Sequence, residues 1–250
     1  MVKTTTPSKE VVPLKVGEGS PSTRQILPNQ IKGASTYLVT VPSRARFELT
    51  SPDSQQVISF LVTGTGTLIT DALYKVMNQL TAFVALPGTP ALLTAEKDCC
   101  LLQIRMDIDP EELRDLDKAS FPIVTAYDNC EFYRDDIKSE KTISRTLIPP
   151  FKVPRFSMGS VQTTGPDHIQ LHAHPVFDQL FFSFAENDCD LLIDGETFSF
   201  GGNCLLYIPR GSEHGIDARS GHTVHYLWLD FFERSDDMEF LVETHKPVPI

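Results

Sequence analysis

Three histidines in the later part of the chain constrain this sequence more than any other feature. His172 and His174 are separated by one residue, and His214 follows a Pro-Arg-Gly turn about forty residues later. Side chains alternate along a β-strand, so two histidines at this spacing on a strand lie on the same face. Neutral imidazoles bind divalent transition metals. The spacing therefore predicts one metal ion held by strands, and Fe, Mn, Ni, Zn and Cu fit equally well.

The residues around these histidines form two motifs. The first is His-Ala-His followed by four residues and then Gln179, and the second is Pro-Arg-Gly-Ser-Glu-His at residues 209–214. Together they resemble the two metal-binding motifs of the cupin superfamily, whose members are small double-stranded β-barrels with a metal at the centre. The resemblance covers roughly residues 150–232. It implies four metal ligands, which are His172, His174, Gln179 and His214.

The match to the family pattern has two departures. Gln179 stands where the family more often has Glu, so the ligand set would carry no negative charge. Asp178 remains the alternative fourth ligand, because its side chain lies at the neighbouring spacing. Gly165, the glycine that opens the first motif, also lies one residue further from the histidine pair than is usual in the family.

The first half of the chain has the same pattern of short apolar runs and turns as the second half, but it lacks the candidate metal ligands. From Gly33 to residue 108, short apolar runs are separated by Gly, Pro, Asp and Asn, which is typical of the short strands of a barrel. The segment at residues 86–90 matches the turn at residues 208–214 but has no histidine, and all seven histidines lie after residue 167. We therefore predict an internal duplication in which only the second half has a metal site.

The predicted fold is all-β, with two double-stranded β-helix barrels of the cupin, jelly-roll-like type joined by a short helical linker. Asp109-Pro110 followed by acidic residues is typical of a helix start and places that helix at residues 109–118. The predicted domains are an N-terminal arm at 1–28, a degenerate cupin barrel at 29–108, a linker at 109–148, and a metal-binding barrel with its tail at 149–250.

Composition limits the partners and the location. With 33 acidic and 22 basic residues the chain has a net charge of −11, which repels phosphate backbones and argues against nucleic-acid binding. There is no apolar run of about 18 residues and no secretory signal, so we expect no membrane partner and a cytoplasmic location. The five cysteines show no CxxC spacing and are expected to be free or buried thiols.

Strand parity predicts which side chains surround the ion. If the strand before the histidine pair is regular, His168 and Gln170 lie on the same face as His172, and Phe181 lies on the same face as Gln179. These three are the predicted substrate-binding residues, although a polar strand end in water would also explain His168 and Gln170. The predicted catalytic residues, as proton-transfer groups on the last strand, are His225 and Tyr226. The alternative for that pair is barrel packing, with an imidazole whose hydrogen bonds are satisfied.

The resemblance implies a metal-dependent enzyme that acts on a small polar or anionic metabolite. We expect oxidative chemistry of the dioxygenase type, since three neutral ligands and one weak ligand leave room for substrate and oxygen. Two alternatives stay open: a non-redox aminohydrolase, isomerase or lyase of the bicupin type, and a metabolite-binding or storage-type bicupin without turnover. The expected partners are a small-molecule substrate and a second copy of the chain in a homodimer, through an apolar strand face near Phe182.

Overall fold

The computed structural model describes residues 6–116 and 119–248 and divides the chain into two compact units. The N-terminal unit is Pro13–Asn129, and the C-terminal unit joins Cys130 and the residues after it to the start of the chain up to Val12. Each unit is built from two antiparallel sheets, so the all-β prediction is confirmed. Among the described helices, none is long and apolar enough to cross a membrane.

The N-terminal unit packs a six-stranded sheet against a four-stranded one. The strands of the larger sheet are, in spatial order, β11 (Ile123–Ala126), β8 (Thr81–Val84), β5 (Gln55–Thr63), β10 (Cys99–Asp107), β3 (Ala34–Val41) and β2 (Ser22–Ile26). Those of the smaller sheet are β4 (Arg46–Glu48), β9 (Ala91–Ala95), β6 (Thr65–Thr70) and β7 (Tyr74–Asn78). Alternate apolar residues of both sheets, such as Leu61, Leu68 and Leu101, are fully buried between them.

The C-terminal unit repeats this plan with an eight-stranded and a four-stranded sheet. The strands of the larger sheet are, in spatial order, β1 (Ser8–Val11), β19 (Cys204–Ile208), β16 (Phe177–Ser183), β21 (Thr223–Phe232), β14 (Phe156–Thr164), β13 (Ile143–Val153), β12 (Glu131–Arg134) and β22 (Lys246–Pro247). Those of the smaller sheet are β15 (Asp167–His172), β20 (His214–Ala218), β17 (Asp188–Ile193) and β18 (Glu196–Gly201). The core between the sheets includes Phe177, Phe181 and Leu206.

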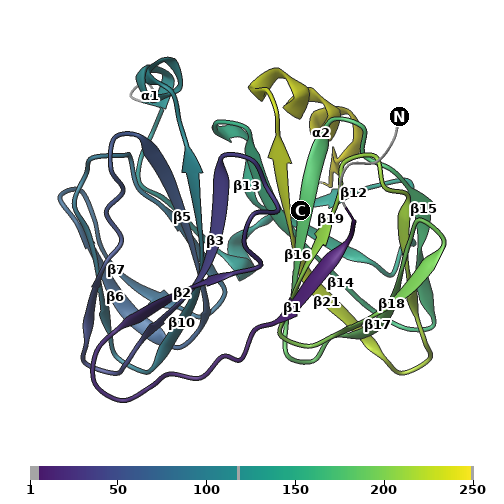
Figure 1. The fold of residues 1–250 in the computed structure, drawn as a ribbon, viewed down its shortest axis with the longest axis horizontal. Helices are drawn as coiled ribbons and strands as arrows, with labels where there is room; N and C mark the ends of the chain where they lie inside the picture. Colours follow the sequence, from purple (N-terminus) through teal and green to yellow (C-terminus); the bar gives the residue numbers. More distant parts are fainter. Residues whose placement is uncertain (1–5, 117–118, 249–250) are drawn as a thin grey trace. The chain divides into compact units, whose positions relative to one another are not determined.

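The predicted N-terminal arm supplies a strand to each unit. β1 pairs antiparallel with β19, from Ser8 opposite Tyr207 to Val11 opposite Cys204, and lies at the edge of the larger C-terminal sheet (Figure 1). The amide of Val12 continues this pairing with a 2.7 Å hydrogen bond to the carbonyl oxygen of Asn203. β2 pairs instead with β3 of the N-terminal unit. The first five residues of the predicted arm lie outside the described residues.

Residues 109–148, predicted as a linker, also supply strands to both units. The predicted helix is α1 (Pro110–Leu116), capped by Asp109, whose Oδ1 accepts hydrogen bonds from the amides of Glu111 and Glu112 at 2.8 and 2.9 Å. β11 then pairs with β8, and a 3-10 turn, η1 (Tyr127–Asn129), ends the N-terminal unit. β12 pairs with β13 and with β22. The sheet pairings therefore place the division between the units at residue 130, before the predicted start of the second barrel at 149.

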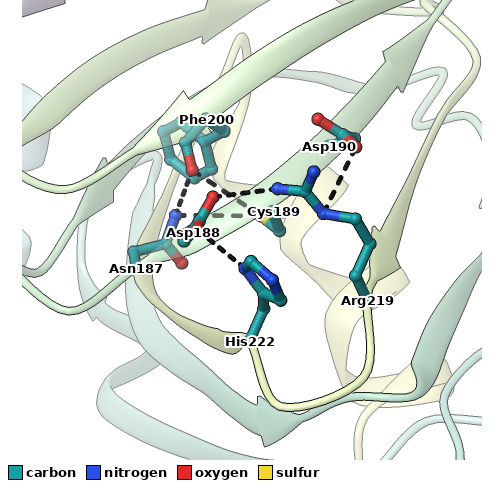
Figure 2. Close-up of polar contacts among 7 residues, drawn as sticks. All are labelled: Asn187, Asp188, Cys189, Asp190, Phe200, Arg219 and His222. Atoms are coloured by element: carbon teal, nitrogen blue, oxygen red, sulfur yellow. Dashed lines mark hydrogen bonds and ion pairs between the residues drawn. The ribbon is translucent and has the colours of Figure 1, made fainter.

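Polar contacts fix one end of the smaller C-terminal sheet (Figure 2). Asp188 at the start of β17 accepts from Nη2 of Arg219 at 3.2 Å and lies 2.7 Å from Nδ1 of His222. The side chain of Asn187 donates to the carbonyl oxygen of Phe200 at 2.6 Å. β17 then runs from Asp188 to Ile193, which pairs with His214. These contacts therefore fix the start of β17, and the opposite end of β17 lies beside the histidine cluster.

The chain ends in the turn η2 (Ser235–Met238) and the short helix α2 (Glu239–Thr244), whose Leu241 is buried. All five cysteines are buried and free, which confirms the prediction from their spacing.

Candidate metal centre

The structure brings the three predicted histidines together inside the C-terminal barrel. His172 ends β15 and pairs directly with His214, the first residue of β20, while His174 lies in the turn before β16. One ring nitrogen from each residue lies within 4.8 Å of those of the other two. The ring centroids of His172 and His214 are 4.3 Å apart. A single ion can therefore contact all three side chains.

Backbone acceptors orient two of the rings. Nδ1 of His172 lies 2.7 Å from the carbonyl oxygen of Gln170, and Nδ1 of His214 lies 3.0 Å from that of Ser212. A carbonyl at this position selects the tautomer with the proton on Nδ1, which leaves the lone pair on Nε2. Nε2 of His214 is buried and has no hydrogen-bond partner among the described residues. This arrangement leaves His214 with a lone pair available to a metal ion.

The three imidazoles are held in the neutral form. Burial is the largest cause that lowers the pKa of His214, to about 3, and the neighbouring His172 lowers it further. Burial and the neighbouring imidazoles lower the pKa of His174 even more strongly, and burial also lowers that of His172. Neutral imidazole is the form that binds metal, so the barrel presents the cluster in its metal-binding state at neutral pH.

Gln179 and Asp178 are neighbours on β16 and lie on opposite faces of it. The Gln179 side chain lines the cavity that contains the histidines, and its Oε1 is buried without a hydrogen-bond partner in the described part of the chain. Oδ1 of Asp178 instead accepts from the hydroxyl of Tyr207 at 2.7 Å and from the amide of Arg210 at 3.0 Å, away from the cavity. Of the two alternatives for the fourth ligand, the geometry favours Gln179.

The aromatic wall of the cavity includes Phe181 and Tyr226, both of which the sequence placed at the site. Their ring centroids are 4.4 Å apart, and both line the cavity beside the indole of Trp228. Trp228 fits there because residue 159 is glycine: a Cβ on Gly159 would lie 2.2 Å from an atom of the indole ring. Burial raises the pKa of Tyr226 well above 10, so its hydroxyl stays protonated and can donate a hydrogen bond.

Two predicted substrate-binding residues, His168 and Gln170, do not line the cavity. The prediction assumed a regular strand, but the pairing of β15 with β20 shifts register between Ile169 and His172. This irregularity changes which residues face inward, so Ile169 lines the cavity while His168, Gln170 and Leu171 are exposed. Gln170 contacts the histidine cluster through its carbonyl oxygen, which orients His172.

His225 does not line the cavity either. Adjacent residues on a strand point to opposite faces, so with Tyr226 inward His225 faces outward from the site. Its backbone amide donates to Oδ1 of Asn187 at 2.7 Å, and its Nδ1 is hydrogen-bonded to the carboxylate of Glu186. Its ring lies 4.3 Å from that of Phe184. The packing alternative therefore describes His225, and only Tyr226 of the predicted pair is placed to act on a substrate.

Besides Asp230 on β21, four polar cavity residues were not predicted from the sequence, and these are Tyr133, Asp135, Lys138 and His245. The ammonium of Lys138 lies 3.1 Å from the hydroxyl of Tyr133 and 3.2 Å from Oδ2 of Asp135. The rings of Tyr133 and His245 are stacked with centroids 3.9 Å apart. These residues come from the predicted linker and from the tail, and the only sequence signal there was a mixture of aromatic and charged residues between 119 and 145.

Comparison with known proteins identifies the fold. No protein-family model and no curated protein matches the sequence. Solved structures do match, at low identity. A cupin 2 conserved barrel domain protein from Leptotrichia buccalis has a TM-score of 0.59 and 12% identity over 88% of this chain and 92% of that one.

Two further solved structures resemble most of the chain. The putative glyoxylate induced protein from Pseudomonas aeruginosa has a TM-score of 0.72 and 11% identity, over 86% of this chain and 82% of that one. An oxalate decarboxylase formate complex from Lactobacillus farciminis has a TM-score of 0.67 and 12% identity, with the same two coverages of 86% and 82%. The chain therefore has the cupin-barrel fold. Its two all-β units form two such barrels, and in the described residues the histidine cluster lies in the second.

Proposed function

We propose that this protein is a metal-dependent enzyme that acts on a small anionic metabolite. One divalent transition-metal ion would be held by the four side chains His172, His174, Gln179 and His214. The observation that carries the proposal is a pair of buried atoms in one cavity, Nε2 of His214 and Oε1 of Gln179, neither of which has a hydrogen-bond partner among the described residues. Buried polar atoms nearly always have a partner, and a cation would satisfy both of these acceptors.

The uncharged ligand set supports an anionic substrate. Three imidazoles and one amide leave the ion its full charge of two, which attracts a carboxylate or an enolate. When bound, such an ion would polarise a substrate oxygen and lower the pKa of a bound water. The cavity has a volume of about 30 Å³. At roughly 10–15 Å³ for each water-sized group, it admits only a small ligand.

A small carboxylate is the substrate class that we favour. One of the structures with a similar fold is an oxalate decarboxylase in complex with formate, although fold similarity alone is an analogy for function. The size of the cavity and the charge of the site agree with this class independently of that analogy.

The protein groups around the cavity favour hydrogen bonding to an anionic substrate. The hydroxyl of Tyr226 is protonated and lines the cavity, and Nε1 of Trp228 is a buried donor without a partner in the described part of the chain. Such donors would orient a carboxylate and stabilise negative charge that develops on it, as an isomerase, lyase or aminohydrolase requires. Dioxygenase chemistry is the second candidate, favoured by the neutral, weak amide ligand Gln179, which leaves room for two further ligands.

Metal content and oxygen uptake test the proposal. The purified protein is expected to hold about one transition-metal ion per chain by elemental analysis, and His172→Ala is expected to hold none. His222→Ala is the matched control, because His222 is hydrogen-bonded to Asp188 at the end of the sheet far from the cluster. A wild-type protein that binds none of Mn, Fe, Ni, Cu or Zn would overturn the metal assignment.

The reaction class follows from the metal-loaded protein. Turnover of small carboxylates without oxygen consumption supports the non-redox enzyme, and stoichiometric oxygen consumption supports the dioxygenase. Binding of these carboxylates with no turnover under either condition would instead support the metabolite-binding or storage-type bicupin.

A further inference from the structure

Lys138 is a buried cation in the cavity of the candidate metal centre. Its side chain is 9% exposed, and the side chain of its neighbour Asp135 is 12% exposed. An ammonium group has three donors. One contacts the hydroxyl of Tyr133 at 3.1 Å and one contacts Oδ2 of Asp135 at 3.2 Å, so one donor remains for a ligand.

The charge of Lys138 acts on the metal-binding residues. Burial is the main cause of the low pKa of His172 and His174, and the positive charge of Lys138 lowers both further. The same charge opposes the effect of burial on the pKa of Asp230, on the other side of Gln179. The geometry agrees, because Lys138 lines the same cavity as the four candidate ligands.

The turn that carries Lys138 does not depend on its ammonium. The amide of Lys138 donates to the carbonyl oxygen of Asp135 at 3.0 Å, and the amide of Ile137 donates to Oδ1 of Asp135 at 3.3 Å. Lys138 also forms a β-bridge with Ile169. These backbone contacts hold the turn, so its fold does not require the ammonium. Burial lowers the pKa of Lys138, but Tyr133 and Asp135 outweigh this effect and raise the pKa overall, so the ammonium stays charged and would attract an anionic ligand in the cavity.

Tyr133 adds a second donor beside the ammonium. Its oxygen accepts a hydrogen bond from Lys138 and also has a hydrogen-bond contact with Ser144, and the hydroxyl can donate one hydrogen bond of its own. Burial is the largest cause that raises the pKa of this phenol, so it remains protonated at neutral pH. The stacked ring of His245 holds Tyr133 in place from the C-terminal segment, where β22 pairs with β12.

We propose that Lys138 and the hydroxyl of Tyr133 bind the carboxylate of the substrate in the cavity and orient the substrate toward the metal. The inference rests on the proposed function, which it extends by naming the recognition residues and the ligand class. Asp135 and His245 are positioning residues, the first for the ammonium and the second for the phenol ring.

Binding of oxalate and formate to the metal-loaded full chain tests this proposal. Four variants are compared with the wild type by isothermal titration calorimetry and by metal content per chain, and these are Lys138→Met, Lys138→Met with Asp135→Asn, Tyr133→Phe and Lys141→Met. Lys141 is the matched control, since it lies in the same segment and is exposed, with its Nζ 3.4 Å from the carbonyl oxygen of Pro166.

We expect both Lys138 variants to keep their metal and to bind oxalate at least about tenfold more weakly, as loss of a charged hydrogen bond implies. Tyr133→Phe should weaken binding by a smaller factor, and Lys141→Met should bind like the wild type. Lys138→Met leaves Asp135 unpaired and could fail to fold for that reason. In that case the oxalate affinity of the double variant, which removes both charges, tests the proposal.

Wild-type oxalate affinity in a folded Lys138 variant would overturn the inference while leaving the proposed function intact. The proposed function has its own readout, because it fails if the wild type binds no added metal. In that case the comparison of oxalate binding between the wild type and Lys138→Met in the metal-free protein still decides whether Lys138 is an anion anchor.

Discussion

Asp230 holds the side-chain amide of Gln179 in a single orientation inside the C-terminal barrel. The two residues are paired across β16 and β21, and Nε2 of Gln179 donates to Oδ1 of Asp230 at 2.8 Å. Burial raises the pKa of Asp230 to about 8, while the hydrogen bond from Gln179 opposes this rise. Because the amide nitrogen of Gln179 is hydrogen-bonded to Asp230, the amide oxygen faces the cavity. Asp230 thus determines which atom Gln179 offers to a metal ion.

The first prediction concerns this pair. Asp230→Ala removes the partner that orients Gln179, and loss of such an outer hydrogen bond typically lowers metal affinity by about 10–100-fold. Gln179→Ala should lower it by at least as much, because it removes the ligand oxygen. Asp178→Asn is the control, since Asp178 contacts Tyr207 and Arg210 instead. Competition with a chelator measures the affinity, and a large loss in Asp178→Asn would contradict the assignment of Gln179.

The second prediction concerns the stability of the metal-free protein at low pH. An unfolded histidine has a pKa of 6.5, and burial lowers that of His214 to about 3 in the folded protein. The unfolded state therefore takes up protons first as the pH falls, so the stability contribution present above pH 6.5 is lost progressively toward pH 3. Urea unfolding midpoints measured from pH 8 downward should fall across this window. His214→Asn should flatten the dependence, and an unchanged slope would contradict the burial of a neutral imidazole.

The third prediction concerns the packing of Trp228. A methyl group at residue 159 would lie 2.2 Å from the indole ring and 2.1 Å from the carbonyl oxygen of Arg145, and strand backbone cannot yield easily. Gly159→Ala should therefore destabilise the protein by about 1–3 kcal/mol, the usual cost of overpacking. Gly201→Ala is the control, because a methyl group there would meet no atom of the described residues within 4 Å. Trp228 is the single tryptophan, so its fluorescence during urea unfolding gives the free energy directly.

The fourth prediction concerns the thiols. Burial raises the pKa of Cys189 to about 12 and that of Cys99 to about 11, and all five cysteines are buried. The thiolate is the reactive form, so the native protein should not react with a disulfide reagent at pH 8 on the timescale of minutes. Five thiols per chain should react after unfolding in denaturant. Rapid reaction of a native thiol would show that one of the barrels opens readily.

Much of the fold and of the candidate site could be predicted from short-range sequence patterns. The His-Ala-His pair and the turn before His214 predicted a cluster that the pairing of β15 with β20 brings together. Alternation along β16 also placed Phe181 on the same face as Gln179, because that strand is regular. Where a strand is regular, residue spacing translates directly into position.

Two kinds of information were absent from the sequence pattern. The register shift between Ile169 and His172 reversed the parity on which the predictions for His168 and Gln170 depended. Nothing in local spacing signals such an irregularity, because it arises from pairing with a distant strand. Lys138 and His245 were missed for a related reason, since both reach the cavity through pairing with distant segments. Lys138 forms a bridge with Ile169, and His245 precedes β22, which pairs with β12 more than a hundred residues earlier.

The pairing of β1 with β19 has a consequence for how the chain folds. Ser8 lies opposite Tyr207, so β1 can pair only after a partner about 200 residues later in the chain has been synthesised. Contacts of such long sequence separation slow folding, because a large loop must close before they form. Until then the edge of β19 stays open to other strands, which is a route to aggregation. A fragment that begins after Val12 would keep that exposed edge permanently, even though it retains every residue of the histidine cluster.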